Sequence, residues 1–262
     1  TAAAKVRPAS LAPFARQADP LEAALHLAAK IGSRPAAGRG ERLAHRYVAE
    51  RFEAAGLSVS TPGFRVPGRG RSRNVIGELE TARECLTILM AHNDNASGVG
   101  VLVALAPRLA KLDPPCDVWL VATGAEERVV IGTRYHVGAA ALVKTVRRRG
   151  PRADLRFALS ADMVGRGRRF YLRSPQAGVR PGVEGEILAA ARRAGVTVRW
   201  APDSGTGNSD HREFELAGLP GAVLEAWKGT DACHHERCDR PGRLQRGALN
   251  RALRVLQQAV SG

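Results

Sequence analysis

Apolar segments of strand length alternate with helical segments through the middle of this chain. Strand-like residues 85–92 lead through Asn-Ala-Ser-Gly into an apolar helical segment at 98–111, followed by a strand-like segment at 117–123, a helical segment at 131–143 and a strand-like segment at 155–160. This βαβαβ order predicts a mostly parallel sheet that helices cover on both faces. In such sheets the chemistry lies at the carboxyl ends of the strands.

The remaining segments extend the same architecture. Residues 20–56 have helical periodicity in two stretches that end before Gly56, and the Pro- and Gly-rich residues 61–73 predict a loop or an irregular hairpin. Further strands are expected at 74–79, 170–172, 196–200 and 222–226, and further helices at 183–194 and 245–259. We therefore expect a three-layer α/β/α fold in a single domain over residues 1–262, with residues 1–19 as an extended N-terminal segment.

Composition agrees with one enzyme-sized domain. The chain has 262 residues, of which 44% are hydrophobic, enough for one sizeable core. No apolar run reaches the length of a membrane span, and the start at Thr1 without an apolar signal segment suggests a processed chain. No heptad or large apolar stripe is present, so a monomer is expected.

The chain is strongly basic, with a formal net charge of +15. Such a charge would suit a nucleic-acid or anionic-surface partner, notably around Arg147–Arg149 and Arg166–Arg169. The basic residues are, however, mostly arginines scattered among Ala and Gly, and no helix-turn-helix, zinc finger or aromatic RNA-binding motif accompanies them. We expect a solvated basic surface and no nucleic-acid partner.

Acidic and imidazole side chains follow three of the central strands. The segment 85–92 ends in His92 with Asp94 just after it, Glu126 and Glu127 follow the second strand, and Asp162 follows the third. Adjacent parallel strands end side by side, so these groups should meet in one cleft, and a mixture of carboxylate and imidazole suits zinc. Two adjacent carboxylates allow one to bind a metal while the other acts as general base.

Four cysteines leave two interpretations open. Cys233 and Cys238 could close a short loop around His234 and His235, and Cys85 and Cys116 could bridge the starts of neighbouring strands. The alternative is four reduced thiols or, for Cys233 and Cys238, zinc ligands, although the chain lacks the second ligand pair of a zinc finger. Two disulfides would indicate an oxidising compartment.

Taken together, these motifs resemble those of the co-catalytic zinc aminopeptidases of clan MH, metallopeptidase family twenty-eight, and most closely the secreted bacterial leucyl-type enzymes. The resemblance rests on the order and strand-end placement of short blocks along nearly the whole chain. These blocks are Ile31–Pro35, Arg73–Ile76, Met90–His92, Asn93–Gly98, Gly124–Glu127, Ala161–Gly165, Ser209–His211 and His235 with Asp239. It implies a fold of the zinc-peptidase (phosphorylase/hydrolase-like) type.

The resemblance also implies a ligand set and a reaction. Asp94 would bridge two zinc ions, His92 and Asp162 would complete one site, and Glu127 and His235 would complete the other. Glu126 would be the general base for a water activated by the two ions, and the enzyme would release N-terminal, apolar residues from peptides with a free amino terminus. The bracketing of His235 by Cys233 and Cys238 matches secreted relatives, which implies a secreted or otherwise extracytoplasmic protein.

Two positions depart from the family pattern. Relatives have a longer loop between the metal-binding His and the bridging Asp, whereas His92 and Asp94 are two residues apart, which predicts that a segment is missing here or that Asp94 does not bridge. Close relatives often have a Tyr at the position of His234, where it contacts the carbonyl oxygen in the transition state. We expect His234 to make this contact with altered pH dependence.

Other polar residues receive ordinary roles. Asp210 and His211 are expected to support the cleft without binding metal, and His26, His45 and His136 are expected to be surface or packing histidines. The alternatives to an aminopeptidase are a carboxypeptidase or dipeptidase, a glutaminyl cyclase with one zinc on the same fold, and a catalytically silent binding homologue. The number of zinc ions per chain distinguishes a two-zinc peptidase from a one-zinc cyclase and from a silent homologue without stoichiometric metal.

Overall fold

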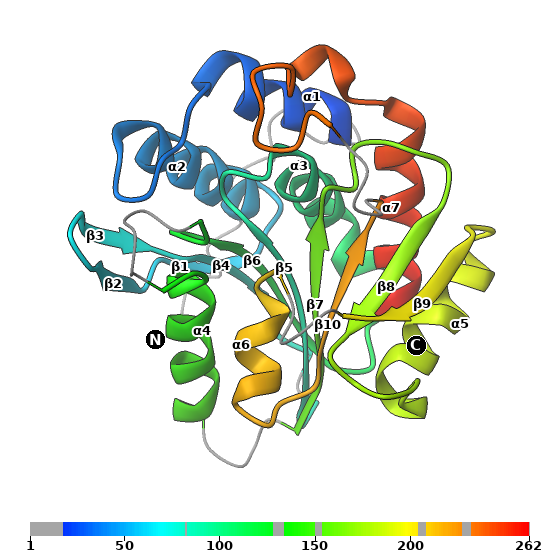
Figure 1. Cartoon of the computed structure of the whole chain (residues 1–262). Coiled ribbons are helices and arrows are strands. Elements are labelled where there is room, and N and C mark those ends of the chain that lie inside the picture. Colours follow the sequence, from blue (N-terminus) through cyan, green and yellow to red (C-terminus); the bar gives the residue numbers. More distant parts are fainter. Residues whose placement is uncertain are drawn as a thin grey trace, which may run out of the picture.

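A computed structural model describes residues 18–81, 83–127, 134–149, 154–203, 208–226 and 232–261. It has three layers, with an eight-stranded sheet between two layers of helices (Figure 1). The predicted α/β/α class is therefore confirmed. Most of the N-terminal segment expected at residues 1–19 lies outside the described residues.

All predicted strands are present, some with shifted bounds. The strands are β1 (Ser58–Ser60), β2 (Gly63–Val66), β3 (Gly70–Arg73), β4 (Val75–Leu79), β5 (Cys85–His92), β6 (Asp117–Thr123), β7 (Asp154–Asp162), β8 (Phe170–Ser174), β9 (Val198–Pro202) and β10 (Gly221–Glu225). The segment 61–73 contains the β2–β3 hairpin, and β9 begins two residues later than the predicted 196–200. β1, which has three residues, was not predicted.

The helical elements likewise follow the expected order. They are α1 (Pro20–Leu25), η1 (His26–Ile31), α2 (Arg39–Ala54), α3 (Ala96–Leu105), η2 (Ala106–Lys111), α4 (Val137–Arg148), η4 (Pro181–Gly185), α5 (Glu186–Arg193), α6 (His211–Leu216), η5 (Pro241–Arg243) and α7 (Arg246–Val260). The helix predicted at 131–143 is wrong in its bounds, because α4 starts at Val137 and continues to Arg148. α6 was not predicted, since six residues carry too little periodicity.

The large sheet has the strand order β1-β4-β6-β5-β7-β10-β8-β9. The central pairs β6/β5, β5/β7 and β7/β10 are parallel, and antiparallel pairing occurs at β1/β4, β4/β6 and β10/β8. The parallel strands β5, β6, β7 and β10 therefore all end on the same side of the sheet, and the arrows of β7 and β10 point upward in Figure 1.

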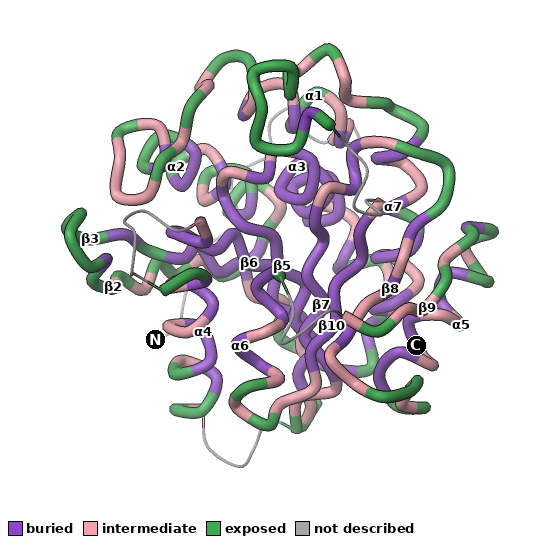
Figure 2. Tube along the Cα trace, viewed as in Figure 1, coloured by how far each residue is buried: buried purple, intermediate pink, exposed green. Residues whose placement is uncertain are grey.

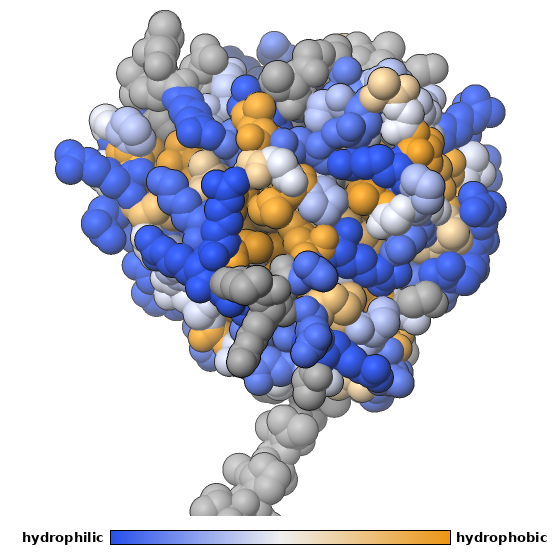
Figure 3. All heavy atoms as spheres, turned by 90° about the horizontal axis from the view of Figure 1, so that it is seen from below, coloured by the Kyte–Doolittle hydropathy of each residue, from blue (hydrophilic) through white to orange (hydrophobic). Residues whose placement is uncertain are grey.

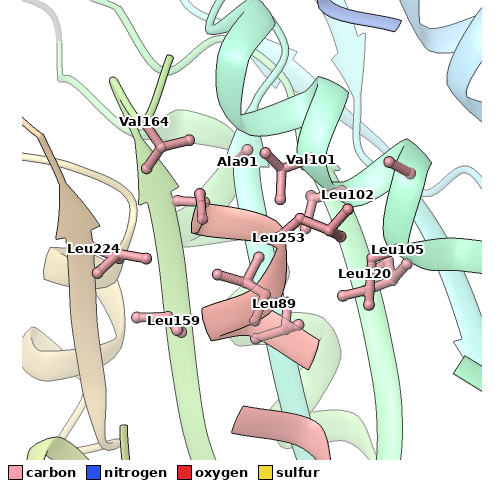
Figure 4. Packing of buried hydrophobic residues seen from close by; sticks show 14 of the residues in the cluster. Leu89, Ala91, Val101, Leu102, Leu105, Leu120, Leu159, Val164, Leu224 and Leu253 are labelled. Carbon is pink, nitrogen blue, oxygen red and sulfur yellow. The ribbon is translucent and has the colours of Figure 1, made fainter. Parts of the chain in front are cut away.

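Each face of the sheet has its own hydrophobic core. On one face, Leu89, Leu120 and Leu159 pack with residues of α3 and α7, as the close view in Figure 4 shows. On the other face, alternate strand residues such as Met90 pack against α4 and against Phe214 of α6. Figure 2 shows the central strands almost wholly buried between these layers, which is why β5 and β6 are continuous apolar runs.

The lower end of the molecule exposes both polar and apolar side chains. Viewed from below, hydrophilic side chains surround a central area of apolar atoms (Figure 3). Among the described residues, no helix has the length and apolar character needed to cross a bilayer.

All four cysteines form disulfide bonds. Cys85 is bonded to Cys116 and Cys233 to Cys238, as the pairing from strand starts and from the short loop predicted. The chain has no free cysteine, so the reduced-thiol and zinc-ligand interpretations of these residues are wrong.

Candidate metal and catalytic site

The candidate site lies at the carboxyl ends of the central strands. His92 is the last residue of β5 and Asp162 the last of β7, while Glu126 follows the end of β6 by three residues. In the sheet register His92 is opposite Thr123, the last residue of β6. His92, Thr123 and Asp162 share the face of the sheet that packs against α4 and α6, because their positions alternate with residues of the opposite core.

His92 is the centre of this arrangement. Its Nδ1 lies 2.7 Å from Asp94 Oδ1 and its Nε2 lies 3.2 Å from Asp162 Oδ1. Glu126 Oε2 is 4.0 Å from His92 Nδ1. Donor atoms of His92, Asp94 and Glu126 all lie within 4.8 Å of one another. We call His92, Asp94 and Asp162 the buried half of the site, since the side chains of His92 and Asp162 are 9% and 12% exposed.

A tight turn brings Asp94 to His92. Asn95 N donates to His92 O at 2.9 Å, and Asn93 N donates to Thr123 O at 2.7 Å. The guanidinium of Arg34 donates to the carbonyl oxygens of Asn93 (2.9 Å) and Asp94 (2.6 Å). His92 and Asp94, two residues apart, are thus joined by a tight turn that brings their side chains into contact.

The turn that carries Glu126 is held from two sides. Ala125 has a left-handed φ of 50°. Its N–H donates to the buried carboxylate of Glu41 at 2.9 Å, and Gly124 N donates to Asn74 Oδ1 at 3.1 Å. A side chain at Gly138 would approach Gly124 O to 2.1 Å, so glycine is required there for α4 to approach this turn. The expected blocks around Asn74 and Gly124–Glu127 therefore meet in space.

His136 contacts the candidate general base, contrary to its expected role as a surface or packing histidine without a partner. Its Nε2 lies 3.0 Å from Glu126 Oε1, and its side chain is 5% exposed. Its Nδ1 faces Glu213 Oε1 at 3.7 Å. The sequence offered no signal for this contact, because His136 is ten residues from Glu126 and precedes a helix whose start was placed too early.

Glu127 and His235 form a second, separate pair, which we call the exposed half of the site. His235 Nε2 lies 2.8 Å from Glu127 Oε1, with side chains 63% and 38% exposed. His235 has a left-handed φ of 59° within the loop that Cys233 and Cys238 close. The His234 ring lies 3.9 Å from the His235 ring, centroid to centroid. Among the described residues, the cluster around His92 does not include this pair.

The Ser209–His211 segment supports the floor of the site. Ser209 Oγ is 2.9 Å from Ser160 Oγ, Asp210 accepts from Thr123 Oγ1 at 2.5 Å, and His211 Nε2 is 2.7 Å from Asp203 Oδ2. Consecutive residues of this segment thus contact β7, β6 and the residue that follows β9. These contacts agree with the supporting role expected for Asp210 and His211.

A contact between Glu225 and Arg173 next to Asp162 was not predicted. Glu225 ends β10 directly beside Asp162 in the sheet register, and its Oε1 lies 2.6 Å from Arg173 Nε. Among the described residues neither of these two atoms has a hydrogen-bond partner, so the side chains are in close contact without a hydrogen bond. Burial raises the pKa of Glu225 to about 8, and Arg173 opposes that effect.

Negative charge dominates the electrostatics of the site. Burial raises the pKa of Glu126 to about 7, although His92 and His136 act in the opposite direction. Burial alone would lower the pKa of His92, but Asp94, Glu126 and Asp162 raise it well above its usual range. A carboxyl group with a pKa near neutrality suits proton transfer, and clustered carboxylates around an imidazole suit a divalent cation.

The donor set fits zinc. Zinc takes imidazole nitrogen and carboxylate oxygen in catalytic sites, and the two halves of the site supply both types. One carboxyl oxygen of the fully buried Asp210 also lacks a hydrogen-bond partner among the described residues, and a nearby cation would favour the ionised form of this carboxyl group.

Comparison with known proteins finds similar sequences and similar folds. The chain is 26% identical over 270 residues to leupeptin-inactivating enzyme 1 of Streptomyces exfoliatus, and the match covers 89% of the chain but 58% of that relative. BSAP, a zinc aminopeptidase from Bacillus subtilis, superposes with a TM-score of 0.80 at 14% identity, covering 92% of this chain and 93% of that one. Fimbriiglobus ruber glutaminyl cyclase superposes with a TM-score of 0.79 at 17% identity, covering 99% and 97%.

These two likenesses at low identity show a shared fold. The family is shown by a match of residues 74–260 to the model of peptidase family M28. This segment contains all the strand-end ligands, the candidate base and the disulfide loop. The chain therefore belongs to peptidase family M28, a family of zinc peptidases.

Proposed function

We propose that this protein is an aminopeptidase that removes N-terminal, apolar residues from peptides with a free amino terminus. The observation that carries the proposal is the buried Glu126 carboxylate, which lies beside the His92–Asp94 cluster in a member of peptidase family M28. BSAP, with the same fold, is a zinc aminopeptidase.

In this proposal the chain holds two zinc ions. His92 and Asp162 would hold one, Glu127 and His235 the other, and Asp94 would bridge them. When bound, zinc supplies a Lewis acid that polarises the scissile carbonyl and lowers the pKa of water.

Glu126 carries the proton in the proposed reaction. Its carboxylate takes a proton from the attacking water, whose oxygen forms a bond to the scissile carbonyl carbon. As the C–N bond breaks, Glu126 passes that proton to the leaving amine, so that one water is consumed and two termini are formed. His234, beside His235, would donate a hydrogen bond to the carbonyl oxygen, as a Tyr does in related enzymes.

Asp94 has a geometry that also fits a second role. At 2.7 Å from His92 Nδ1 it could orient the imidazole without bridging. The zinc content of Asp94→Asn distinguishes the roles: a bridging carboxylate predicts loss of bound zinc, whereas an orienting one predicts retained zinc with weaker affinity.

The first experiment compares a short peptide with its N-acetylated twin, with mass spectrometry before and after zinc chelation. The proposal predicts trimming of the free peptide alone, from its amino end, and none after chelation. Cleavage at the carboxyl end of both peptides would contradict the aminopeptidase assignment.

Glu126→Gln tests the base. It should retain zinc and lose about a hundredfold or more of kcat. The matched control is Glu50→Gln, the same change at an exposed position of α2, which should leave kcat unchanged. Full activity of Glu126→Gln would exclude its role.

A glutaminyl cyclase is the second candidate. Two observations favour it: the likeness to the Fimbriiglobus ruber cyclase, and the single cluster of ligands found among the described residues. One zinc per chain together with cyclisation of an N-terminal glutaminyl peptide would replace the first proposal.

Two disulfides support an extracytoplasmic location. Both bonds should be found by mass spectrometry in protein isolated from the producing cell without added oxidant. Reduced thiols in that sample would contradict this location.

A further inference from the structure

We infer that His136 is a positioning residue that fixes the carboxylate of Glu126, and that Glu213 fixes His136 from behind. The inference rests on the proposed role of Glu126 as base. The juxtaposition that carries it is a buried line of side chains from the site to α6, namely Glu126, His136 and Glu213.

The two oxygens of Glu126 face different partners. Oε1 lies 3.0 Å from His136 Nε2, and Oε2 points toward His92 Nδ1 at 4.0 Å. A carboxylate that acts as a base can only accept hydrogen bonds, so His136 Nε2 must carry the hydrogen and donate it. Donation to Oε1 fixes the carboxyl plane and leaves Oε2 directed at the His92–Asp94 cluster, where the proton is to be taken.

The backbone of His136 is bonded to the same residue. His136 N donates to Glu126 O at 2.7 Å, and Val137 N donates to Ala125 O at 3.1 Å. His136 adopts a left-handed conformation, with φ of 56° and ψ of 36°, which residues with a side chain adopt only when their surroundings impose it. Both the main chain and the side chain of this residue therefore hold Glu126.

Glu213 is the group behind the imidazole. Its Oε1 lies 3.7 Å from His136 Nδ1, too far for a direct hydrogen bond but close enough for a charge interaction. Arg134 and Arg212 both contact the Glu213 carboxylate, so that carboxylate is itself fixed. Carboxylates face the imidazole from both elements packed against it: Glu126 from the turn after β6, and Glu213 and Asp210 from α6 and its N-cap.

Buried volume alone does not explain these contacts. A histidine that served only to fill space would not require a donor aimed at one particular oxygen. His45 shows the contrast: it is buried on α2, and neither of its ring nitrogens has a hydrogen-bond partner in the part of the chain that the structure describes. Removing the donor from His136 while keeping its size therefore separates positioning from packing.

The test compares His136→Leu with His136→Gln. Leu fills similar volume without a donor, whereas the Gln side-chain amide can place an N–H close to the position of Nε2. We expect His136→Leu to lower kcat by about ten- to a hundredfold, with KM within about twofold and zinc content unchanged. His136→Gln should recover most of this loss, and Glu213→Gln should lower kcat by only a few-fold.

Coupling to Glu126 completes the kinetic test. In the Glu126→Gln background, His136→Leu should cause little further loss, because the group that it positions is no longer a base. His26→Leu, a change at the η1 histidine that stacks on Tyr47, is the matched control and should leave kcat unchanged. An equal loss in both backgrounds, or no recovery with Gln, would overturn the inference.

A spectroscopic measurement separates this inference from the proposed function. The ¹⁵N shifts of the His136 ring should report a protonated Nε2 in the wild type that responds to Glu126→Gln. This result is expected whether the substrate proves to be a peptide bond or an N-terminal glutaminyl group. An unprotonated Nε2, or one that is indifferent to Glu126→Gln, would exclude the contact even in a fully active enzyme.

Discussion

The buried and exposed halves of the site are built in different ways. His92 and Asp162 end central strands, and their side chains are 9% and 12% exposed. Glu127 and His235 are 38% and 63% exposed, and His235 lies in a loop that the Cys233–Cys238 bond closes. The sheet positions the first set through its register, while the loop that carries His235 is held by the disulfide and by local hydrogen bonds, such as that from Glu236 N to Cys233 O. Substitutions in the two halves should therefore differ in how strongly they lower zinc content and turnover.

The largest effect is expected from His92→Gln in the buried half. His92 contacts both Asp94 and Asp162, so its loss removes the side chain that lies between these two candidate ligands. Turnover should fall by more than about a thousandfold, since several kcal/mol of charge stabilisation are removed. Zinc content by mass spectrometry should fall with it. Stoichiometric zinc in an inactive His92→Gln protein would show that this half is not the metal centre.

A substitution in the exposed half should lower turnover less than His92→Gln does. His235→Ala leaves the His92 contacts intact, so we expect one zinc to be lost and turnover to fall by about a hundredfold. Chelator titration of the wild type, followed by metal analysis, should likewise release zinc in two steps. A single step, or a loss as large as that of His92→Gln, would remove the distinction between the halves.

The two disulfides should separate stability from metal binding. Cys85→Ala/Cys116→Ala opens a 31-residue separation and should cost about 3–4 kcal/mol of unfolding free energy with little effect on zinc affinity. Cys233→Ala/Cys238→Ala opens a separation of five residues beside His235 and should weaken the second zinc by about tenfold. Thermal unfolding and zinc titration of both variants check this, and the reverse pattern would contradict it.

The smallest expected effect is on how the free energy of unfolding depends on pH. The pKa of Glu225, beside Asp162, is raised by burial to about 8, so the folded protein binds more protons than the unfolded chain between about pH 4.5 and 8. The free energy of unfolding that this group contributes therefore falls as pH rises through that window. Glu225→Gln should gain in Tm relative to the wild type between pH 5 and 8. A constant difference in Tm would show that Glu225 has an ordinary pKa.

The sequence predicted the buried half better than the rest for a physical reason. Continuous apolar runs identify buried parallel strands, and His92 and Asp162 stand where those runs end. Nothing local marks His136, whose partner Glu126 is reached only through the packing of α4 against the turn at Gly124. Glu225 was missed because an acidic residue at a strand end resembles a turn residue until Arg173 of β8 is placed beside it.

The Cys85–Cys116 bond joins β5 to the residue just before β6, at the end of the sheet opposite the site. Side chains of a strand alternate between faces, so a slip of one residue between β5 and β6 would turn His92 away from Thr123 and toward the α3 side. A covalent tie at the start of β5 and just before β6 favours the alignment of the later pairs. The bond at one end of these strands thus constrains the face of the sheet on which the imidazole of His92, the candidate ligand at their other end, lies.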